Sequence, residues 1–289
     1  MNTFSSKTRK QQAIYAEALK WHIDAGADEA INDIPTNFLA LTKTAKQSSE
    51  SDKTLPTNSV NEFSKNEPKT QKKSSINLNT NNENFETAEK LAEKSLSLSS
   101  LKRNISKFEG CRLKSTATNL VFGAGQVEAD VMFIGEAPGR EEDRDGAPFI
   151  GVSGQLLDLM LSYIGLSRDQ NIYITNILPW RPPGNRHPTD TEVASCMPFV
   201  KRHIQLVSPR VLVLLGGAAY KALTNNSEGI TRVRGKWFEY EQPVLSKAET
   251  QIIPTVATLH PAYILRQPAQ KKAIWKDLIS VRNRLNNIN

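Results

Sequence analysis

A carboxylate stands at the end of a predicted strand, in a loop rich in glycine and proline. The loop follows the apolar run 131–134 and consists of Gly135, Glu136, Ala137, Pro138 and Gly139. In open α/β sheets, ligands bind beyond the carboxyl ends of the strands. Glycine and proline at such a point allow the backbone to approach a planar ligand closely. The pattern predicts an active-site loop, although glycine-rich turns are also common in α/β proteins without a site there.

Three further loops with unusual residues also follow predicted strands. They span residues 176–186, 216–217 and 260–266. Parallel strands would place these loops along one edge of a sheet, together with the loop that contains Glu136. The sequence therefore predicts a single site built from four separated segments.

The elements that would position these loops alternate between apolar strands and amphipathic helices. This alternation is typical of a parallel sheet. We predict the fold class α/β, as a three-layer α/β/α sandwich with a central, mainly parallel sheet. The predicted strands span residues 131–134, 172–176, 211–215 and 251–258, and the predicted helices 155–164, 192–206, 218–223 and 270–285.

The region before this sheet has a different composition. Residues 1–45 have apolar positions at helical spacing and are predicted to form an N-terminal helical segment. Residues 46–84 are dominated by Ser, Asn, Thr and Lys, which bury too little apolar surface to fold, so we predict a disordered linker. Residues 85–106 are predicted as a helical lead-in to a globular domain over residues 107–289.

The amino-acid composition indicates which binding partners and which cellular compartment to expect. The net charge is +7 over 289 residues, and the basic excess lies after residue 100, which favours a polyanion such as nucleic acid. Cys111 and Cys196 lack metal-ligand spacing, so no zinc site or disulfide framework is predicted. Without a long apolar run or a secretory signal, we expect no membrane insertion and a cytoplasmic, nucleoid-associated protein. The acid-free first 16 residues leave an organelle transit peptide as the alternative.

Several motifs together resemble the uracil-DNA glycosylase superfamily, specifically its family 4 branch. They occur in the same order over roughly residues 107–285. The segments with this resemblance are 135–139, 142–143 with 146–149, 151–157, 173–176, 181–186 and 260–266.

The resemblance implies roles for residues in the predicted loops. Glycosylases extrude the target nucleotide and bind its base in a pocket, so Phe149 is the predicted stacking platform and Asn176 the group that recognises the uracil edge. His260 would donate a hydrogen bond to uracil O2, and Glu136 would hold the attacking water, with Asp143 as a second candidate. The alternatives are a core aromatic for Phe149, a turn for Asn176, a structural histidine for His260 and a solvated loop for Asp143.

The same loops offer groups for DNA. Arg181, Arg186 and the backbone amides of Gly216 and Gly217 would position phosphates. A wedge that fills the space of the flipped base would come from the segment after His260, and the sequence does not decide which residue inserts. The candidates are Tyr263, Leu265 and Arg266.

The chain departs from its family at the iron–sulfur cluster. Family 4 members typically hold a [4Fe-4S] cluster with four cysteines, and this chain has two. Alignment of Cys111 and Cys196 with two of them places Phe108 and Trp180 at the other two positions. Aromatic side chains cannot ligate iron, so we predict that the cluster is absent, that no other metal or cofactor replaces it, and that aromatic packing fills its place.

The predicted function is uracil excision from DNA by a monomer. The alternatives are a non-catalytic DNA-binding or replication-associated module and a nucleosidase-like hydrolase. A serine or cysteine hydrolase is disfavoured because no nucleophile elbow occurs. Residues 1–84 are predicted to offer a contact for a repair or replication protein.

Overall fold

The computed structural model of the protein describes residues 78–244 and 249–288. The predictions for residues 1–45 and 46–77 lie outside the described residues. Helix α3 (Leu78–Glu93) is the first described element, so residues 78–84 are helical and the predicted linker boundary at 84 is wrong. Helix α4 (Leu98–Lys107) follows separately, because Ser97 caps it through a reciprocal pair of hydrogen bonds with Ser100.

Six strands of the described part form one sheet with the order β1-β3-β2-β4-β6-β5. The four inner strands are parallel, and β1 and β5 are antiparallel edge strands. The predicted α/β class with a mainly parallel sheet is therefore confirmed, and the two edge strands are additions to it. The strands are β1 (Ala124–Gly125), β2 (Val131–Gly135), β3 (Ile172–Asn176), β4 (Val211–Leu215), β5 (Trp237–Pro243) and β6 (Thr250–Thr258).

The helices expected from periodicity are present, with ends shifted by one to three residues. They are α6 (Val152–Ser162), α7 (Asp190–Val207), α8 (Gly217–Thr224) and α11 (Lys271–Ile288). Short helices occur within the predicted loops: α5 (Arg140–Asp145), α10 (Pro261–Arg266) and the 3-10 helix η2 (Pro183–Asn185). Others occur where the sequence assigns no element: α9 (Ile230–Val233) and the 3-10 helices η1 (Arg112–Ser115) and η3 (Pro268–Gln270). Among the described residues, no helix combines the length and the apolar character that crossing a bilayer requires.

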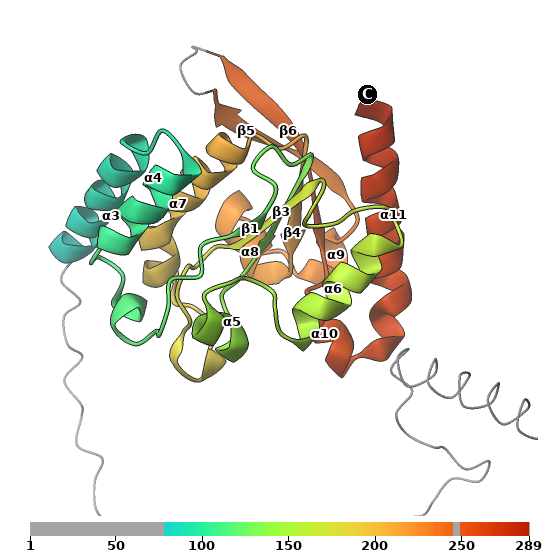
Figure 1. Ribbon diagram of the computed structural model, residues 1–289, viewed down its shortest axis with the longest axis horizontal. Coiled ribbons are helices and arrows are strands. Elements are labelled where there is room, and N and C mark those ends of the chain that lie inside the picture. Colours follow the sequence, from blue (N-terminus) through green and yellow to red (C-terminus); the bar gives the residue numbers. More distant parts are fainter. Residues whose placement is uncertain (1–77, 245–248, 289) are drawn as a thin grey trace, which may run out of the picture. The chain divides into compact units, whose positions relative to one another are not determined.

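The core lies on both faces of the sheet because successive strand residues point to opposite sides. Val131 and Phe133 of β2 pack in a cluster with residues of α6 and α11, while Met132 and Ile134 pack in a second cluster with residues of α7 and α8. Figure 1 shows α6, α10 and α11 on one side of the sheet and α3, α4 and α7 on the other. This arrangement confirms the three-layer sandwich.

The parallel register aligns the ends of the inner strands. Gly135, the last residue of β2, is paired with Asn176, the last residue of β3. Leu215 of β4 is likewise paired with Thr258 of β6, two residues before His260. The loops after these strands therefore leave the sheet at one edge.

Candidate active site

A cavity of about 660 Å³ lies at this edge of the sheet. All four predicted loops contribute to its lining, as does η2 with the residues after it. The predicted site residues that line it are Glu136, Ala137, Pro138, Gly139, Phe149, Asn176, Arg186, Gly216, Gly217, His260, Tyr263 and Arg266. The structure thus brings together residues that are up to 130 positions apart in the chain.

Gly135 allows two of these side chains to meet. A Cβ atom at Gly135 would lie 2.4 Å from Asn176 Oδ1 and 2.5 Å from Phe149 Cζ, closer than any real contact of such atoms. The absence of a side chain therefore lets the Phe149 ring pack directly against the end of β2, beside the Asn176 amide. This is the close approach that the glycine in this loop predicts.

The Phe149 backbone adopts a left-handed conformation, with φ of 54°, which non-glycine residues seldom adopt. Arg168 stabilises it, because its guanidinium donates hydrogen bonds to the carbonyl oxygens of Pro148 and Phe149 at 2.7 and 2.5 Å. Arg168 is itself paired with Asp158 of α6. The ring is 5% exposed and is stacked on His260, with 5.6 Å between ring centroids.

Glu142 holds the two sides of this loop together. Its buried carboxylate accepts hydrogen bonds from the backbone amides of Gly139, Ile150 and Gly151, at 3.0, 3.1 and 2.9 Å. The loop that contains Glu136 and the segment that ends at Phe149 are therefore joined through one side chain.

Glu142→Gln is expected to lower the free energy of unfolding by about 2 kcal/mol, because an amide cannot replace a carboxylate that accepts three backbone hydrogen bonds. Denaturant unfolding of the full chain measures this loss. The exposed neighbour Glu141 gives the matched control Glu141→Gln, for which a change below about 0.5 kcal/mol is expected. Equal losses in the two variants would contradict the role of Glu142.

Asn176 lines the cavity and has an unsatisfied hydrogen-bond acceptor. The residue is 6% exposed, and its Oδ1 accepts no hydrogen bond from any described residue. A buried polar atom without a partner is costly, which makes such atoms rare in folded proteins. The Asn176 amide is therefore poised to bind a ligand that offers a donor.

His260 is oriented by the start of helix α10. The backbone N–H of Ala262 donates a hydrogen bond to His260 Nδ1 at 3.2 Å, so Nδ1 acts as the acceptor. Burial lowers the pKa of His260 to about 4, and the positive charge of Arg266 acts in the same direction. The neutral imidazole then has its proton on Nε2, which leaves one N–H donor for a ligand.

Stability is expected to fall as the pH decreases, because burial keeps His260 neutral. The folded pKa of about 4 lies below the ordinary value of 6.5, so the unfolded chain takes up the proton first. Full stability is therefore present above pH 6.5 and is lost between pH 6.5 and 4. Between pH 7 and pH 5 this one group is expected to remove about 2 kcal/mol.

Denaturant titrations of the wild type and His260→Asn at the two pH values measure this loss. The buried His203, whose pKa burial lowers to about 3, contributes with the same sign in both proteins and cancels in the difference. An identical pH dependence in the two proteins would contradict a His260 that stays neutral in the folded protein.

Glu136 projects from the loop after β2 and has one described side-chain partner. Its Oε1 accepts a hydrogen bond from Nδ1 of His187, at 2.8 Å. His187 also lines the cavity, from the segment between η2 and α7. His187 is absent from the predicted site. The sequence did contain a signal for it, because His187 directly follows the 176–186 loop and is one of four histidines in the chain.

Four residues of the predicted site lie outside the cavity lining: Gly135, Asp143, Arg181 and Leu265. Asp143 is buried, and its Oδ1 accepts hydrogen bonds from the backbone amides of Thr118 and Asn119 at 2.8 and 3.2 Å, outside the cavity lining. This placement gives Asp143 a structural role, because helix α5 turns it away from the cavity. Arg181 and Leu265 also lie outside the lining, and Leu265 is 45% exposed on α10.

Comparisons with known proteins agree with this geometry. The family model described as the uracil DNA glycosylase superfamily matches residues 122–279. The chain belongs to the uracil DNA glycosylase superfamily. It is 37% identical over 191 residues to the type-4 uracil-DNA glycosylase of Sulfurisphaera tokodaii, across 64% of this chain and 84% of the relative. It is also 39% identical over 185 residues to that of Archaeoglobus fulgidus, across 63% and 89%.

The resemblance to family 4 of the uracil DNA glycosylase superfamily is thereby confirmed. Whether the iron–sulfur cluster expected for that branch fits this chain depends on the residues at the four ligand positions. Phe108, Cys111, Trp180 and Cys196 meet in one apolar cluster between α3, α4 and α7, and each is at most 3% exposed. The neighbouring Cys196 thiol lowers the pKa of Cys111, and the neighbouring Cys111 thiol together with burial raises the pKa of Cys196.

A four-iron cluster does not fit these residues. It requires four anionic ligands, and two of the four positions hold aromatic side chains that fill the space. The Phe108 ring contacts Phe199 edge to face, with centroids 5.1 Å apart. Within residues 78–244 and 249–288, no group of three or more His, Cys, Asp or Glu could hold a metal.

Proposed function

We propose that this chain is a monofunctional uracil-DNA glycosylase, which hydrolyses the N-glycosidic bond of a uracil flipped out of DNA and so starts base excision repair. One observation supports it above the others: Asn176, whose buried Oδ1 has no hydrogen-bond partner among the described residues, lines the same cavity as His260 and Phe149. These three groups match the edge, the O2 atom and the face of a uracil base.

Recognition follows from the donor and acceptor pattern of the base. Asn176 Oδ1 accepts from uracil N3–H, and its NH2 group donates to uracil O4. Cytosine has an acceptor at N3 and an amino donor at C4, so both contacts would be mismatched. The Phe149 ring offers the stacking surface for the flipped base, and Arg168 and Glu142 hold the backbone of Phe149 and of Gly151.

Bond cleavage leaves charge on both fragments. The bond between N1 and C1′ breaks, its electron pair leaves with the uracil, and the sugar becomes positive at C1′. We propose that the Nε2–H of His260 stabilises the negative charge on uracil O2, as a donor placed where charge develops. Glu136 holds the water that adds to C1′, takes its proton and favours the cationic sugar electrostatically.

DNA would bind across the rim of the cavity. Tyr263 and Arg266 line it from α10, and Leu265 of the same helix is the exposed apolar side chain available to enter the space of the flipped base. Gly216 and Gly217 both line the cavity, but the N–H of Gly216 donates to the carbonyl oxygen of Thr258 at 2.8 Å, so the predicted use of its amide for phosphate is wrong. The amide of Gly217, the first residue of α8, would bind phosphate. Arg181 donates from Nε to Oδ1 of Asn185, a residue of the cavity lining, and would add positive charge there.

The enzyme is proposed to work without an iron–sulfur cluster. The thiols and aromatic rings at the cluster position pack in the core beside α3, whereas the catalytic groups lie at the strand ends. We further propose a monomeric, cytoplasmic and nucleoid-associated protein, in which residues 1–84 bind a repair or replication protein.

The substrate is tested with three oligonucleotides that differ at one position, which holds uracil, cytosine or thymine. Alkali cleaves the strand wherever a base has been released, so labelled fragments measure excision. We expect cleavage of the uracil strand alone, and no release of uracil from free uridine. Release from uridine would instead show a nucleosidase, and binding of all three strands without cleavage would show a DNA-binding module.

A further inference from the structure

The single described partner of the Glu136 carboxylate is a side chain that is itself largely in solvent. The His187 side chain is 91% exposed, and that of Glu136 is 26% exposed. An exposed ion pair is weak on its own, because holding two side chains in one geometry costs entropy and water screens the attraction. Their 2.8 Å contact therefore needs support from the backbone on which His187 stands.

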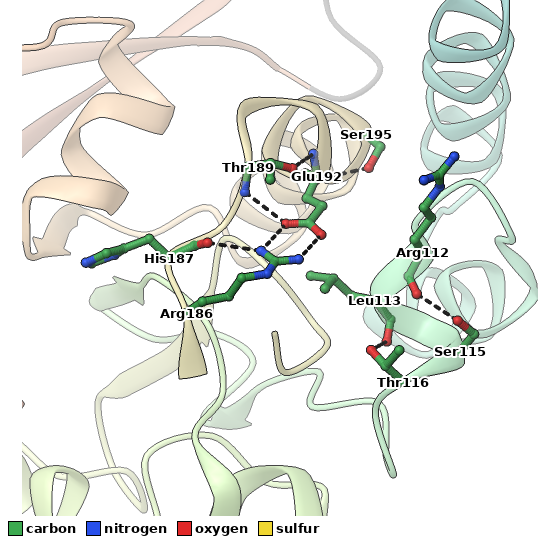
Figure 2. A network of polar contacts seen from close by, with 9 residues as sticks. All are labelled: Arg112, Leu113, Ser115, Thr116, Arg186, His187, Thr189, Glu192 and Ser195. Carbon is green, nitrogen blue, oxygen red and sulfur yellow. Dashed lines mark hydrogen bonds and ion pairs between the residues drawn. The ribbon is translucent and has the colours of Figure 1, made fainter. Parts of the chain in front are cut away.

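That support comes from the start of helix α7. Figure 2 shows Arg186 between Glu192 and the backbone of His187. The two terminal nitrogens of Arg186 donate to the two carboxylate oxygens of Glu192 at 2.9 and 2.7 Å, and Nη1 also donates to the His187 carbonyl oxygen at 3.0 Å. A bidentate pair of this kind fixes orientation as well as distance.

Glu192 is fixed in turn by the first turn of α7, to which it belongs. Its Oε2 accepts from the backbone N–H of Thr189 at 2.9 Å, and the Thr189 hydroxyl accepts from the backbone N–H of Glu192 at 3.2 Å. This reciprocal pair is a capping box at the N-terminus of α7. A continuous series of contacts thus connects a rigid helix to the carboxylate at the strand edge.

We propose that His187 is a positioning residue for Glu136, held in place by the Arg186–Glu192 pair. The inference rests on the proposed function, since it assigns a purpose to the orientation of the water-holding carboxylate. The Nδ1–H of His187 occupies Oε1 of Glu136, which leaves Oε2 for the water. Arg186 then acts within the protein, although its sequence context suggests a phosphate contact.

The location of the pair explains why its geometry matters. Glu136 and His187 line both the main cavity and a second cavity of about 400 Å³, whose walls include Ile177, Val193 and Met197. A carboxylate at this junction could turn toward either space. The hydrogen bond from His187 selects one orientation, so that less of the binding geometry has to be set when the substrate arrives.

The test separates the chemical step from DNA binding. Single-turnover release of uracil gives the rate constant of the bound complex, and titration with the same oligonucleotide gives the affinity. His187→Ala is expected to lower the rate constant about tenfold with affinity within twofold of the wild type, and His187→Gln, which retains an N–H donor, to recover about half of that loss on a logarithmic scale. Glu192→Gln should lower the rate constant about threefold.

A double-mutant cycle distinguishes positioning from an independent role. If His187 acts through Glu136, His187→Ala adds no further loss to Glu136→Gln. The exposed Lys272 of α11 provides the control for truncation of a surface side chain, and Lys272→Ala should leave the rate constant unchanged. Additive losses, an unchanged rate in His187→Ala, or a loss confined to DNA affinity would overturn the proposal.

A spectroscopic signal keeps this result separate from that of the proposed function. Nitrogen-15 NMR of the full chain should show the Nδ1–H form of the His187 imidazole in the wild type, and Glu136→Gln should change that signal. An unchanged signal would overturn the pairing whether or not uracil is released. If the signal changes as expected and the wild type releases no uracil, then the proposed function has failed while the pairing stands.

Discussion

His260→Ala is expected to slow uracil release by about 10²- to 10³-fold, which is the usual loss when one preorganised donor to a developing negative charge is removed. The imidazole is neutral, because burial lowers the pKa of His260 to about 4. Its Nδ1 is occupied by the backbone N–H of Ala262, so the Nε2–H is the donor that remains. Single-turnover assays with a uracil oligonucleotide measure the loss.

Because His260 also caps α10, the His260→Ala substitution requires a control for stability. Removal of the side chain also deprives the Ala262 N–H of its acceptor, and lost caps typically destabilise a protein by about 1 kcal/mol. Asparagine is a good cap with a shorter side chain, so His260→Asn should restore stability and remain as slow as the alanine variant. Recovery of the rate in His260→Asn would show that the alanine effect is structural.

Asn176→Asp is expected to reduce excision of uracil by on the order of 10³-fold, because a site built for hydrogen bonding strongly rejects a mismatched partner. The carboxylate loses the NH2 donor to uracil O4 and places a negative oxygen there instead. It is also buried, which adds the cost of removing a charge from water. The rate on uracil at saturating enzyme measures the effect.

The matched control for this substitution is Asn226→Asp, at an exposed asparagine outside the cavity lining. It introduces the same charge and should leave the rate within twofold of the wild type. Thermal unfolding of both variants shows whether the fold is retained. An Asn176→Asp protein that folds and still excises uracil at the wild-type rate would contradict recognition of the base by Asn176.

The inner sheet could be predicted from the sequence because its strands are continuous apolar runs between helical patterns. The residues of β2 are all buried, as expected for a strand covered on both faces. Edge strand β5 was missed, although Phe238, Tyr240 and Gln242 alternate with Trp237 and Glu239 in the period of a half-buried strand. The residues of β5 alternate in character and do not form a continuous apolar run, which is the pattern that identified the inner strands.

The site could be predicted as a set of loops, but not in its internal contacts. Four strand ends in parallel register bring Glu136, Asn176 and His260 to one edge, and the topology alone implies this. The direction in which a side chain leaves a short helix or a turn could not be predicted from the sequence. Helix α5 turns Asp143 toward the backbone of Thr118, and Arg186 is paired with Glu192, because tertiary contacts decide which hydrogen bonds form.

The most direct test of a glycosylase that works without a cluster is the specific activity of purified protein set against its iron content. Free uracil released from a single-uracil oligonucleotide is quantified in several fractions of one preparation, together with iron and the visible absorbance. We predict the same uracil release per mole of protein in every fraction, with iron far below one atom per chain. Activity that rises in proportion to iron, or the absence of uracil release from well-folded protein, would contradict the account.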